Sequence, residues 1–320
     1  MFIIKYKKIF IFLSLILVSF SVWAFMFFGV KLGIDFKGGA LIEVVYKTER
    51  PAQDILQKDL ETLKLGSILL QPTGNLGYLV KSRDLTNLEH SSILKTLSLD
   101  GKNQLEETNF NSIGPSIGKE LAKKAFSIVT LTILAIIFFI AFAFRKVSKP
   151  VSSWKYSFIA IITLLHDVLV MTGFFVFLSY YYGVELDTLF IVAVLITFTL
   201  SISDTIVIFD RIRENLKDFK LSAGGQTLRI QKGLTSGSSG STGSSFAETV
   251  GKSLEQSFFR SICTSMTAIL VLLALFFFGP ILTKYFALML IVGMVIGTYS
   301  SIFLASPLLV LVEELQNRKK

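Results

Sequence analysis

The sequence predicts an α-helical polytopic membrane protein with six transmembrane helices and one small α+β domain of ferredoxin-like order. Hydrophobic residues make up 52% of the 320 residues and charged residues only 17%, a composition typical of a membrane protein with some water-exposed mass. Six apolar runs are long enough to cross a bilayer as helices. A mostly polar stretch, residues 31–124, separates the first run from the second.

The apolar runs define the predicted spans. Lys5, Lys7 and Lys8 precede the first run, whose length and lack of a small-residue cleavage site predict an uncleaved anchor rather than a signal peptide. A lone cysteine, Cys263, excludes an internal disulfide. In chain order, the predicted spans are residues 9–30, 126–144, 156–180, 188–209, 261–278 and 285–312.

The polar stretch after the first span has the pattern of a folded domain. Strand-like alternation or β-rich runs occur at residues 41–46, 67–71, 78–82 and 104–110, and helical patterns at residues 52–65 and 85–97. The resulting β-α-β-β-α-β order predicts a split-βαβ, ferredoxin-like domain.

The net charge of +9 has a distribution that indicates orientation. Basic residues gather at 145–155, 211–220 and 318–320, whereas the opposite loops, 181–187 and 279–284, carry little positive charge. By the positive-inside rule, both termini are expected in the cytoplasm and residues 31–124 are expected to be extracytoplasmic. The cations therefore indicate a membrane lipid environment and no nucleic-acid partner.

The predicted segments follow from these spans. Residues 235–245 form a Gly/Ser tract that is expected to be a flexible coil, and a natural insertion and an engineered linker both explain it. The segments are 1–30, the first transmembrane helix; 31–124, the extracytoplasmic domain; 125–210, transmembrane helices two to four; 211–259, a cytoplasmic loop; 260–312, the last two transmembrane helices; and 313–320, a cytoplasmic tail.

Asp204 is the strongest functional candidate, because it is the one ionisable residue in the fourth span, 188–209. A carboxylate within a transmembrane helix costs roughly 2.5–3.5 kcal/mol on insertion scales, so it should face a partner or a wet cavity. The alternative is a buried aspartate that serves helix packing alone.

Three further residues are candidates for proton transfer together with Asp204. Arg260, at the start of the fifth span, would keep Asp204 charged when paired with it, and its withdrawal would leave the carboxylate to take up a proton. His166 would relay protons and Asp167 would hold or receive them. A structural polar contact between helices remains open for His166 and Asp167. For Arg260, the alternative is an arginine that reaches the membrane interface.

The sequence carries no signs of an enzyme, a metal site or a cofactor site. It has no Cys/His spacing typical of zinc, no nucleophile motif, and no phosphate loop, since residues 33–39 lack the strand-then-helix context. We interpret residues 33–39 as a bend between the first helix and the first strand. An intramembrane aspartyl hydrolase using Asp167 and Asp204 is disfavoured because its motifs are missing. Gly293 and Gly297 allow close helix approach.

Six short motifs together resemble one family over nearly the whole chain. In this order, and placed on these spans, they are similar to the SecF subunits of the SecD/SecF protein-export family, which is related to the resistance-nodulation-division transporters. The motifs are residues 33–39, 112–118, 165–168, 203–215, 260–265 and 297–307.

The resemblance implies a function and partners. It implies a heterodimer with SecD, association with the SecYEG translocon, and use of the proton motive force to promote translocation of exported unfolded polypeptides across the bacterial inner membrane. It also implies that Asp204 and Arg260 take part in proton movement. Ser203 stands where the family often has Asn, and the Gly/Ser tract lengthens the loop, which leaves the placement of residues 248–259 open. A passive scaffold subunit, or half of another transporter of the same superfamily, is the alternative.

Overall fold

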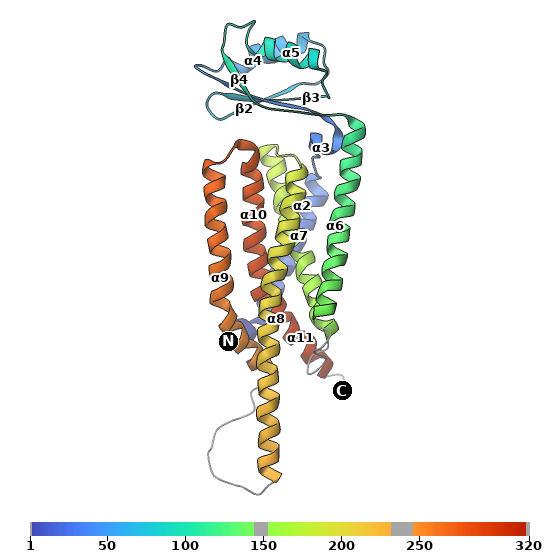
Figure 1. Ribbon diagram of the computed structural model, residues 1–320, viewed down its shortest axis with the longest axis vertical. Helices are drawn as coiled ribbons and strands as arrows, with labels where there is room; N and C mark the ends of the chain where they lie inside the picture. Colours follow the sequence, from blue (N-terminus) through green and yellow to red (C-terminus); the bar gives the residue numbers. More distant parts are fainter. Residues whose placement is uncertain (1, 144–152, 232–245, 318–320) are drawn as a thin grey trace. The chain divides into compact units, whose positions relative to one another are not determined.

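The chain folds into two compact units (Figure 1). The computed structural model describes residues 2–143, 153–231 and 246–317. The unit that we call the helical unit comprises the chain up to Gly29, Leu131–Gly183 and the chain from Leu189 onward. The sheet unit comprises Val30–Thr130 and takes in Val184–Thr188 as well.

Six helical stretches in the described residues are long and apolar enough to cross a membrane, which confirms the predicted polytopic fold. They are Lys7–Phe28, Pro115–Phe142, Lys155–Tyr182, Thr188–Leu216, Phe246–Phe278 and Thr283–Gln316. The helices are α1 (Phe2–Lys5), α2 (Lys7–Phe28), α6 (Pro115–Ala143), α7 (Ser153–Tyr182), α8 (Thr188–Gln231), α9 (Phe246–Phe278), α10 (Ile281–Tyr299) and α11 (Ser306–Asn317).

The last span is not one regular α-helix. A π-helix, η1 (Ser300–Ala305), separates α10 from α11. Pro307 lies just after it and cannot donate a backbone hydrogen bond to the preceding turn. Such insertions occur frequently at functional sites. The apolar run predicted one regular helix over this span, although Pro307 is a signal for an irregular helix.

Helices α8 and α9 continue well beyond the predicted spans. Of the segment expected to be a cytoplasmic loop, 211–259, the described residues are helical. The Asn215 amide of α8 donates to Ser253 Oγ of α9 at 2.8 Å and to Gln256 Oε1 at 2.9 Å. These bonds place the start of α9 beside α8. The sequence alone had not decided the placement of residues 248–259. The Gly/Ser tract 235–245 lies outside the described residues.

The sheet unit contains four antiparallel strands in the order β2-β3-β1-β4. The central pair aligns Ile42 with Val80, and the other side of β1 aligns Ile42 with Phe110. The β-α-β-β-α-β order predicted for this region is present, preceded by a short helix that was not predicted. The elements are α3 (Ile34–Lys37), β1 (Gly39–Tyr46), α4 (Gln53–Thr62), β2 (Leu69–Thr73), β3 (Gly77–Ser82), α5 (Asn87–Leu97) and β4 (Leu105–Ile113).

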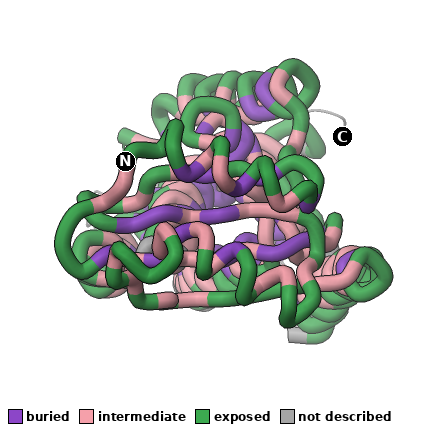
Figure 2. The backbone as a smooth tube through the Cα atoms, turned by 90° about the horizontal axis from the view of Figure 1, so that it is seen from above, coloured by how far each residue is buried: buried purple, intermediate pink, exposed green. Residues whose placement is uncertain are grey.

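An apolar core packs helices α4 and α5 against one face of the sheet. Buried positions alternate with more exposed ones along β1, as expected for a strand covered on one face. Figure 2 shows the backbone from above, coloured by how far each residue is buried. The Tyr46 hydroxyl donates to the Leu97 carbonyl at 2.8 Å, and burial raises the pKa of Tyr46 above its usual value. The core residues are Ile42, Val44, Tyr46, Leu56, Leu60, Leu65, Ile68, Leu70, Tyr78, Val80, Ile93 and Leu97.

Candidate functional site

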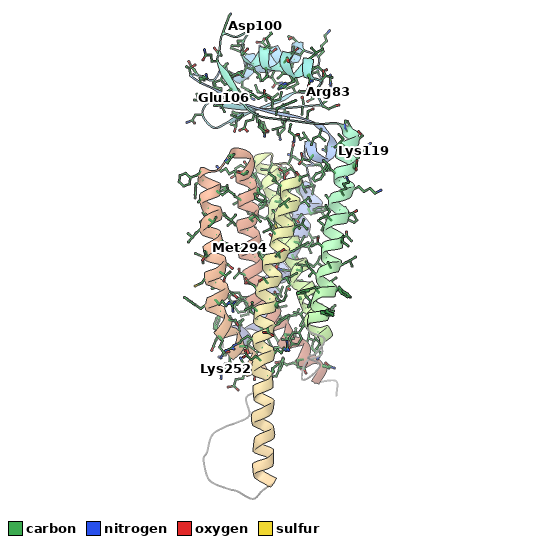
Figure 3. All side chains as sticks on the ribbon, viewed as in Figure 1. Arg83, Asp100, Glu106, Lys119, Lys252 and Met294 are labelled. Atoms are coloured by element: carbon green, nitrogen blue, oxygen red, sulfur yellow. The ribbon has the colours of Figure 1, made fainter. Side chains whose placement is uncertain are left out.

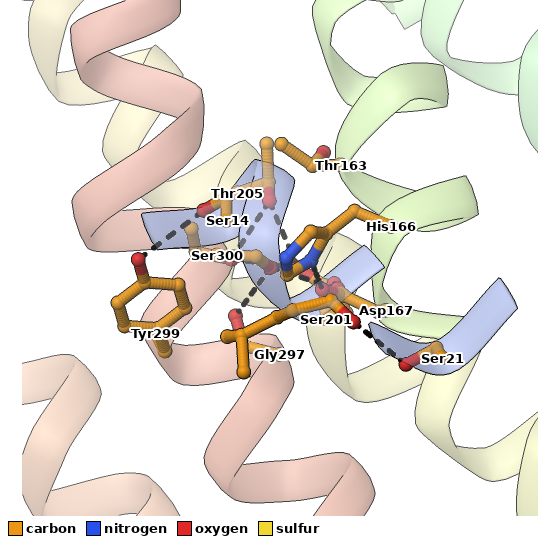
Figure 4. Close-up of polar contacts among 12 residues, drawn as sticks. Ser14, Ser21, Thr163, His166, Asp167, Ser201, Thr205, Gly297, Tyr299 and Ser300 are labelled. Carbon is orange, nitrogen blue, oxygen red and sulfur yellow. Dashed lines mark hydrogen bonds and ion pairs between the residues drawn. The ribbon is translucent and has the colours of Figure 1, made fainter. Parts of the chain in front are cut away.

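Asp167 is the most deeply buried acidic residue of the helical unit, with 0% of its surface exposed. Its Oδ2 accepts hydrogen bonds from the hydroxyl groups of Ser201 on α8 and Ser300 on η1, the latter at 2.8 Å (Figure 4). Its Oδ1 lies 2.9 Å from His166 Nδ1. A buried carboxylate is tolerated only when such partners replace water, so the three contacts explain how this acid fits among apolar helices.

His166 completes this cluster from α7. The ring is buried, with 5% exposed, and its Nε2 has no hydrogen-bond partner among the described residues. Tyr299 lies across from it, with ring centroids 6.3 Å apart. An imidazole with one nitrogen on a carboxylate and the other unpartnered has a free position for a proton or a water molecule.

Close helix contacts bring the cluster together. A Cβ atom built on Gly297 would lie 3.0 Å from Ser201 Cβ, and one on Gly293 would lie 2.2 Å from Thr197 Oγ1. The Gly-x-x-x-Gly pattern on α10 therefore does what was expected of it, since it lets α10 approach α8 closely. This approach places Ser300 within reach of Asp167.

Two hydroxyl groups extend the cluster toward η1. Thr205 Oγ1 lies 2.8 Å from Ser301 Oγ, and Ser301 Oγ donates to the Ser201 carbonyl at 3.2 Å. Both hydroxyls are buried. The π-helix therefore contributes two consecutive serines, Ser300 and Ser301, to the same polar region.

Asp204 follows Ser201 by three residues on α8, but its contact is with α10 and not with Asp167. It is half-buried, and Thr298 Oγ1 donates to its Oδ2 at 3.5 Å. Thr298 Oγ1 is in turn 2.5 Å from Ser265 Oγ of α9. Asp204 thus has a weak hydroxyl contact on α10 in place of the predicted arginine.

Arg260 is not brought to Asp204. Its side chain is exposed on α9, and within the described part of the chain it forms no ion pair. The position of Arg260 follows from the periodicity of α9. Buried serines recur every four residues along this helix, and Arg260 is not on the face that they form. The buried serines of this face are Ser253, Ser257, Ser261 and Ser265.

Sequence reasoning found the ionisable residues and missed their hydroxyl partners. His166 and Asp167 come together as a pair, whereas Asp204 and Arg260 stay apart. The missed residues are Ser201, Thr205, Ser300 and Ser301. A serine or threonine in an apolar run cannot be told from an ordinary helix residue by its sequence context alone. The one available signal was the run Ser300-Ser301 shortly after Gly297. The described residues contain no group of three or more His, Cys, Asp or Glu side chains placed to hold a metal ion.

Comparisons with known proteins agree with this architecture. The model of the family "Protein export membrane protein SecD/SecF, C-terminal" matches residues 93–315, and that of the SecD/SecF GG motif matches residues 23–49. The protein translocase subunit SecF of Thermobaculum terrenum is 36% identical over 318 residues, which cover 96% of this chain and 92% of that protein. SecF of Haemophilus influenzae is 30% identical over 307 residues, covering 94% and 82%.

The fold is also similar to solved structures. The crystal structure of SecDF from Thermus thermophilus, described as a translocon-associated membrane protein, is 26% identical and superposes with a TM-score of 0.75. That match covers 97% of this chain and 38% of the SecDF chain, so this chain spans well under half of that protein. SecDF in a super-membrane-facing form gives a TM-score of 0.60. The chain belongs to the SecD/SecF family of protein-export membrane proteins, within its SecF subunits of protein translocases.

Proposed function

We propose that this chain works as one half of a proton-driven SecDF assembly that promotes export of unfolded polypeptides through the SecYEG translocon. The chain spans 38% of a single SecDF chain, which leaves the larger part to a SecD partner. The expected location is the bacterial inner membrane, with both termini cytoplasmic and the sheet unit extracytoplasmic, as the distribution of basic residues indicates. The proposal assigns the chain no catalytic site, and protons supply the energy, roughly 2.3 kcal/mol per charge for each 100 mV.

The observation that carries the proton route is the cluster around Asp167. A carboxylate with 0% exposure, a histidine with one unpartnered nitrogen and four hydroxyl groups lie together inside the transmembrane helices. All of these groups exchange protons or donate hydrogen bonds, while an apolar interior would be cheaper for stability alone. We assign His166 and Asp167 to internal proton transfer.

Asp204 and Arg260 serve the same route from the surface of the chain. Asp204 is half-buried and Arg260 is exposed, so both can meet a partner subunit. A charge exposed on a transmembrane helix is costly unless it is paired or reaches water. We therefore place the neutralisation of Arg260 in the complex with SecD, and assign Asp204 to proton uptake or release next to that interface.

The substitution Asp204→Asn tests this function. The amide keeps the size and the contact to Thr298 but cannot take up and release a proton. Export of a preprotein into membrane vesicles is expected to lose the part that depends on the proton gradient, while the variant still co-purifies with SecD. Ser203→Ala, on an exposed neighbour in the same helix turn, is the matched control and should export normally. Normal gradient-dependent export by Asp204→Asn would favour the passive scaffold instead.

A further inference from the structure

We infer that the buried serines of α9 line a path of hydroxyl groups and water molecules, which conducts protons between Asp204 and the end of the helical unit that holds Asn215. The inference deepens the proposed function, on which it rests, because it names the route by which a proton reaches or leaves Asp204. All of the residues involved belong to the helical unit.

The buried serines of α9 recur with the period of the helix. They occupy every fourth position along one face, and each of these residues is at most 7% exposed. A spacing of four residues is slightly more than one turn, so successive serines lie about 6 Å apart along the helix axis. The members of this set, which we call the serine row, are Ser253, Ser257, Ser261 and Ser265.

Each end of the serine row contacts a polar side chain of another helix. Ser265 Oγ lies 2.5 Å from Thr298 Oγ1, whose hydroxyl donates to Asp204 Oδ2 at 3.5 Å. At the other end, the Asn215 amide donates to Ser253 Oγ at 2.8 Å. The serine row therefore lies between two polar side chains of α8, the acid Asp204 and the amide Asn215.

The spacing of these contacts on α8 matches the length of the serine row. Asp204 and Asn215 are eleven residues apart, close to three full turns, so both lie on the same face of α8. At 1.5 Å per residue this is roughly 16 Å of α8, and the twelve residues from Ser253 to Ser265 span roughly 18 Å of α9. The serine row is therefore long enough to cover the whole distance between the two contacts.

The Asn215 end of the serine row reaches exposed polar side chains. The Asn215 amide also donates to Gln256 Oε1 at 2.9 Å, and Arg211 Nε donates to the same oxygen at 2.7 Å. Gln256 is exposed on α9. Water can therefore meet this end of the row, whereas Ser261 and Ser265 lie deeper among the helices.

Ser261 is the residue that points to a bound water molecule. Its Oγ is buried and has no hydrogen-bond partner among the described residues. By contrast, the hydroxyls of Ser253 and Ser265 donate to the carbonyls four residues earlier, at 2.7 Å and 3.0 Å. A buried hydroxyl without a partner is costly, and water molecules satisfy such groups inside proteins. Ser261 Oγ is therefore the place where the row binds water.

A row of hydroxyls and water can conduct protons without being changed. Each oxygen accepts a proton from one neighbour and releases another to the next, because a hydroxyl is both donor and acceptor. One proton enters at one end for each proton that leaves at the other. A transfer needs two oxygens within hydrogen-bond reach or one bridging water, and one water bridges the roughly 6 Å between successive serines.

Close helix packing is the competing explanation, since small residues also let membrane helices approach one another. Ser261→Ala separates the two, because alanine is small but leaves Ser257 and Ser265 about 12 Å apart, too far for one water to bridge. Gradient-dependent export of a preprotein into vesicles that contain the complex with SecD should fall about tenfold. Thr267→Ala is the matched control and should export normally, since Thr267 is an exposed hydroxyl of the same helix.

A second measurement detects water at the serine row directly. Ser261→Cys is combined with Cys263→Ser, which removes the single native thiol. Silver ions, which travel with water, should bind the new thiol in the folded complex and protect it from a maleimide added after unfolding. Ala287→Cys is the control, at a fully buried position of α10 outside the serine row, and its thiol should stay unprotected.

The outcomes separate this inference from the proposed function. Normal gradient-dependent export by Ser261→Ala would overturn the proton path. A thiol in Ser261→Cys that silver ions fail to protect would overturn it as well, because poor export by Ser261→Ala would then reflect packing alone. Normal export by Asp204→Asn would instead overturn the proton-driven function, and silver protection, which needs no gradient, is measured independently of that result.

Discussion

The helical unit and the sheet unit both bury apolar side chains, but they differ in the polar side chains that they bury. In the described residues, every buried serine, threonine, histidine and acidic residue belongs to the helical unit, among them His166, Asp167 and Ser300. The core of the sheet unit is made of aliphatic and tyrosine side chains alone. Large apolar side chains such as Phe278, 90% exposed, cover the outside of the helical unit, whereas charged side chains such as Arg83 and Asp100 extend from the sheet unit (Figure 3).

The solvent explains this difference. Water satisfies polar groups on the surface of the sheet unit, so its stability comes from removing apolar area from water. Lipid tails satisfy no polar group, and they are as apolar as leucine, so membrane helices gain little from burying leucine and must bring their polar groups inside. The polar groups buried among the apolar side chains of the helical unit therefore contribute to helix packing and mark the place where proton chemistry can occur.

The largest expected effect is on the sheet unit, where apolar burial dominates. Leu60 on α4 is fully buried in the core. Leu60→Ala should lower the free energy of unfolding of this unit by about 4 kcal/mol, because it removes transfer energy and leaves a cavity. Hydrogen exchange of β1 and α4 amides measures this. Ile55→Ala, on the exposed face of the same helix, is the control and should change exchange little; equal effects would contradict an apolar core.

A smaller effect is expected for the central acid of the helical unit. Asp167→Ala removes the acceptor of the Ser201 hydroxyl and one of the two acceptors of the Ser300 hydroxyl, which also donates to the Gly297 carbonyl at 3.1 Å. This should lower stability by about 2 kcal/mol, because single hydrogen bonds between membrane helices are weak. Unfolding in a detergent mixture followed by circular dichroism measures the change. Asp167→Asn keeps an acceptor and should lose less. If Asp167→Ala lowered the free energy of unfolding as much as Leu60→Ala does, the predicted difference between the two units would be wrong.

Close helix packing should show a graded effect. Gly293→Ala places a Cβ atom 2.2 Å from Thr197 Oγ1, and Gly297→Ala places one 3.0 Å from Ser201 Cβ. We expect about 1–2 kcal/mol of destabilisation for Gly293→Ala and less for Gly297→Ala, since overpacking cost rises with the overlap. The same detergent unfolding experiment ranks them. The reverse order would show that α8 and α10 do not pack through these glycines.

The smallest effect concerns an exposed charge on the sheet unit. The bond from Arg83, followed by those from the Thr86 backbone and hydroxyl, lowers the pKa of Glu89 from 4.5 to about 2. A lowered folded-state pKa means that this stabilisation is complete above about pH 4.5 and is lost as the pH falls toward about 2. In Glu89→Gln, the protection of the first turn of α5 from hydrogen exchange should lose this pH dependence. An unchanged acid profile would contradict it.

Sequence patterns predicted the fold well because they act over short distances. Hydropathy located the spans, and alternation located strands such as β1, since both depend on a residue's own solvent preference. Asp204 stood out for the same reason, as one charge in an apolar run. The sequence did not show that Asp204 lacks an arginine partner, because its pairing with Arg260 depends on the rotation of α9 about its own axis. The serine that α9 buries at residue 261 follows an arginine that it exposes at residue 260.

Residue order alone determined that the chain has six membrane-spanning stretches and a small β-α-β-β-α-β domain. Solvent preference and turn formation depend only on a residue and its near neighbours in the sequence. The tertiary structure decided which hydroxyls surround Asp167, since Ser201 and Ser300 lie 34 and 133 residues away from it. Contacts of this kind depend on helix rotation and register, and the periodicity of a single helix contains no information about the rotation of its neighbour.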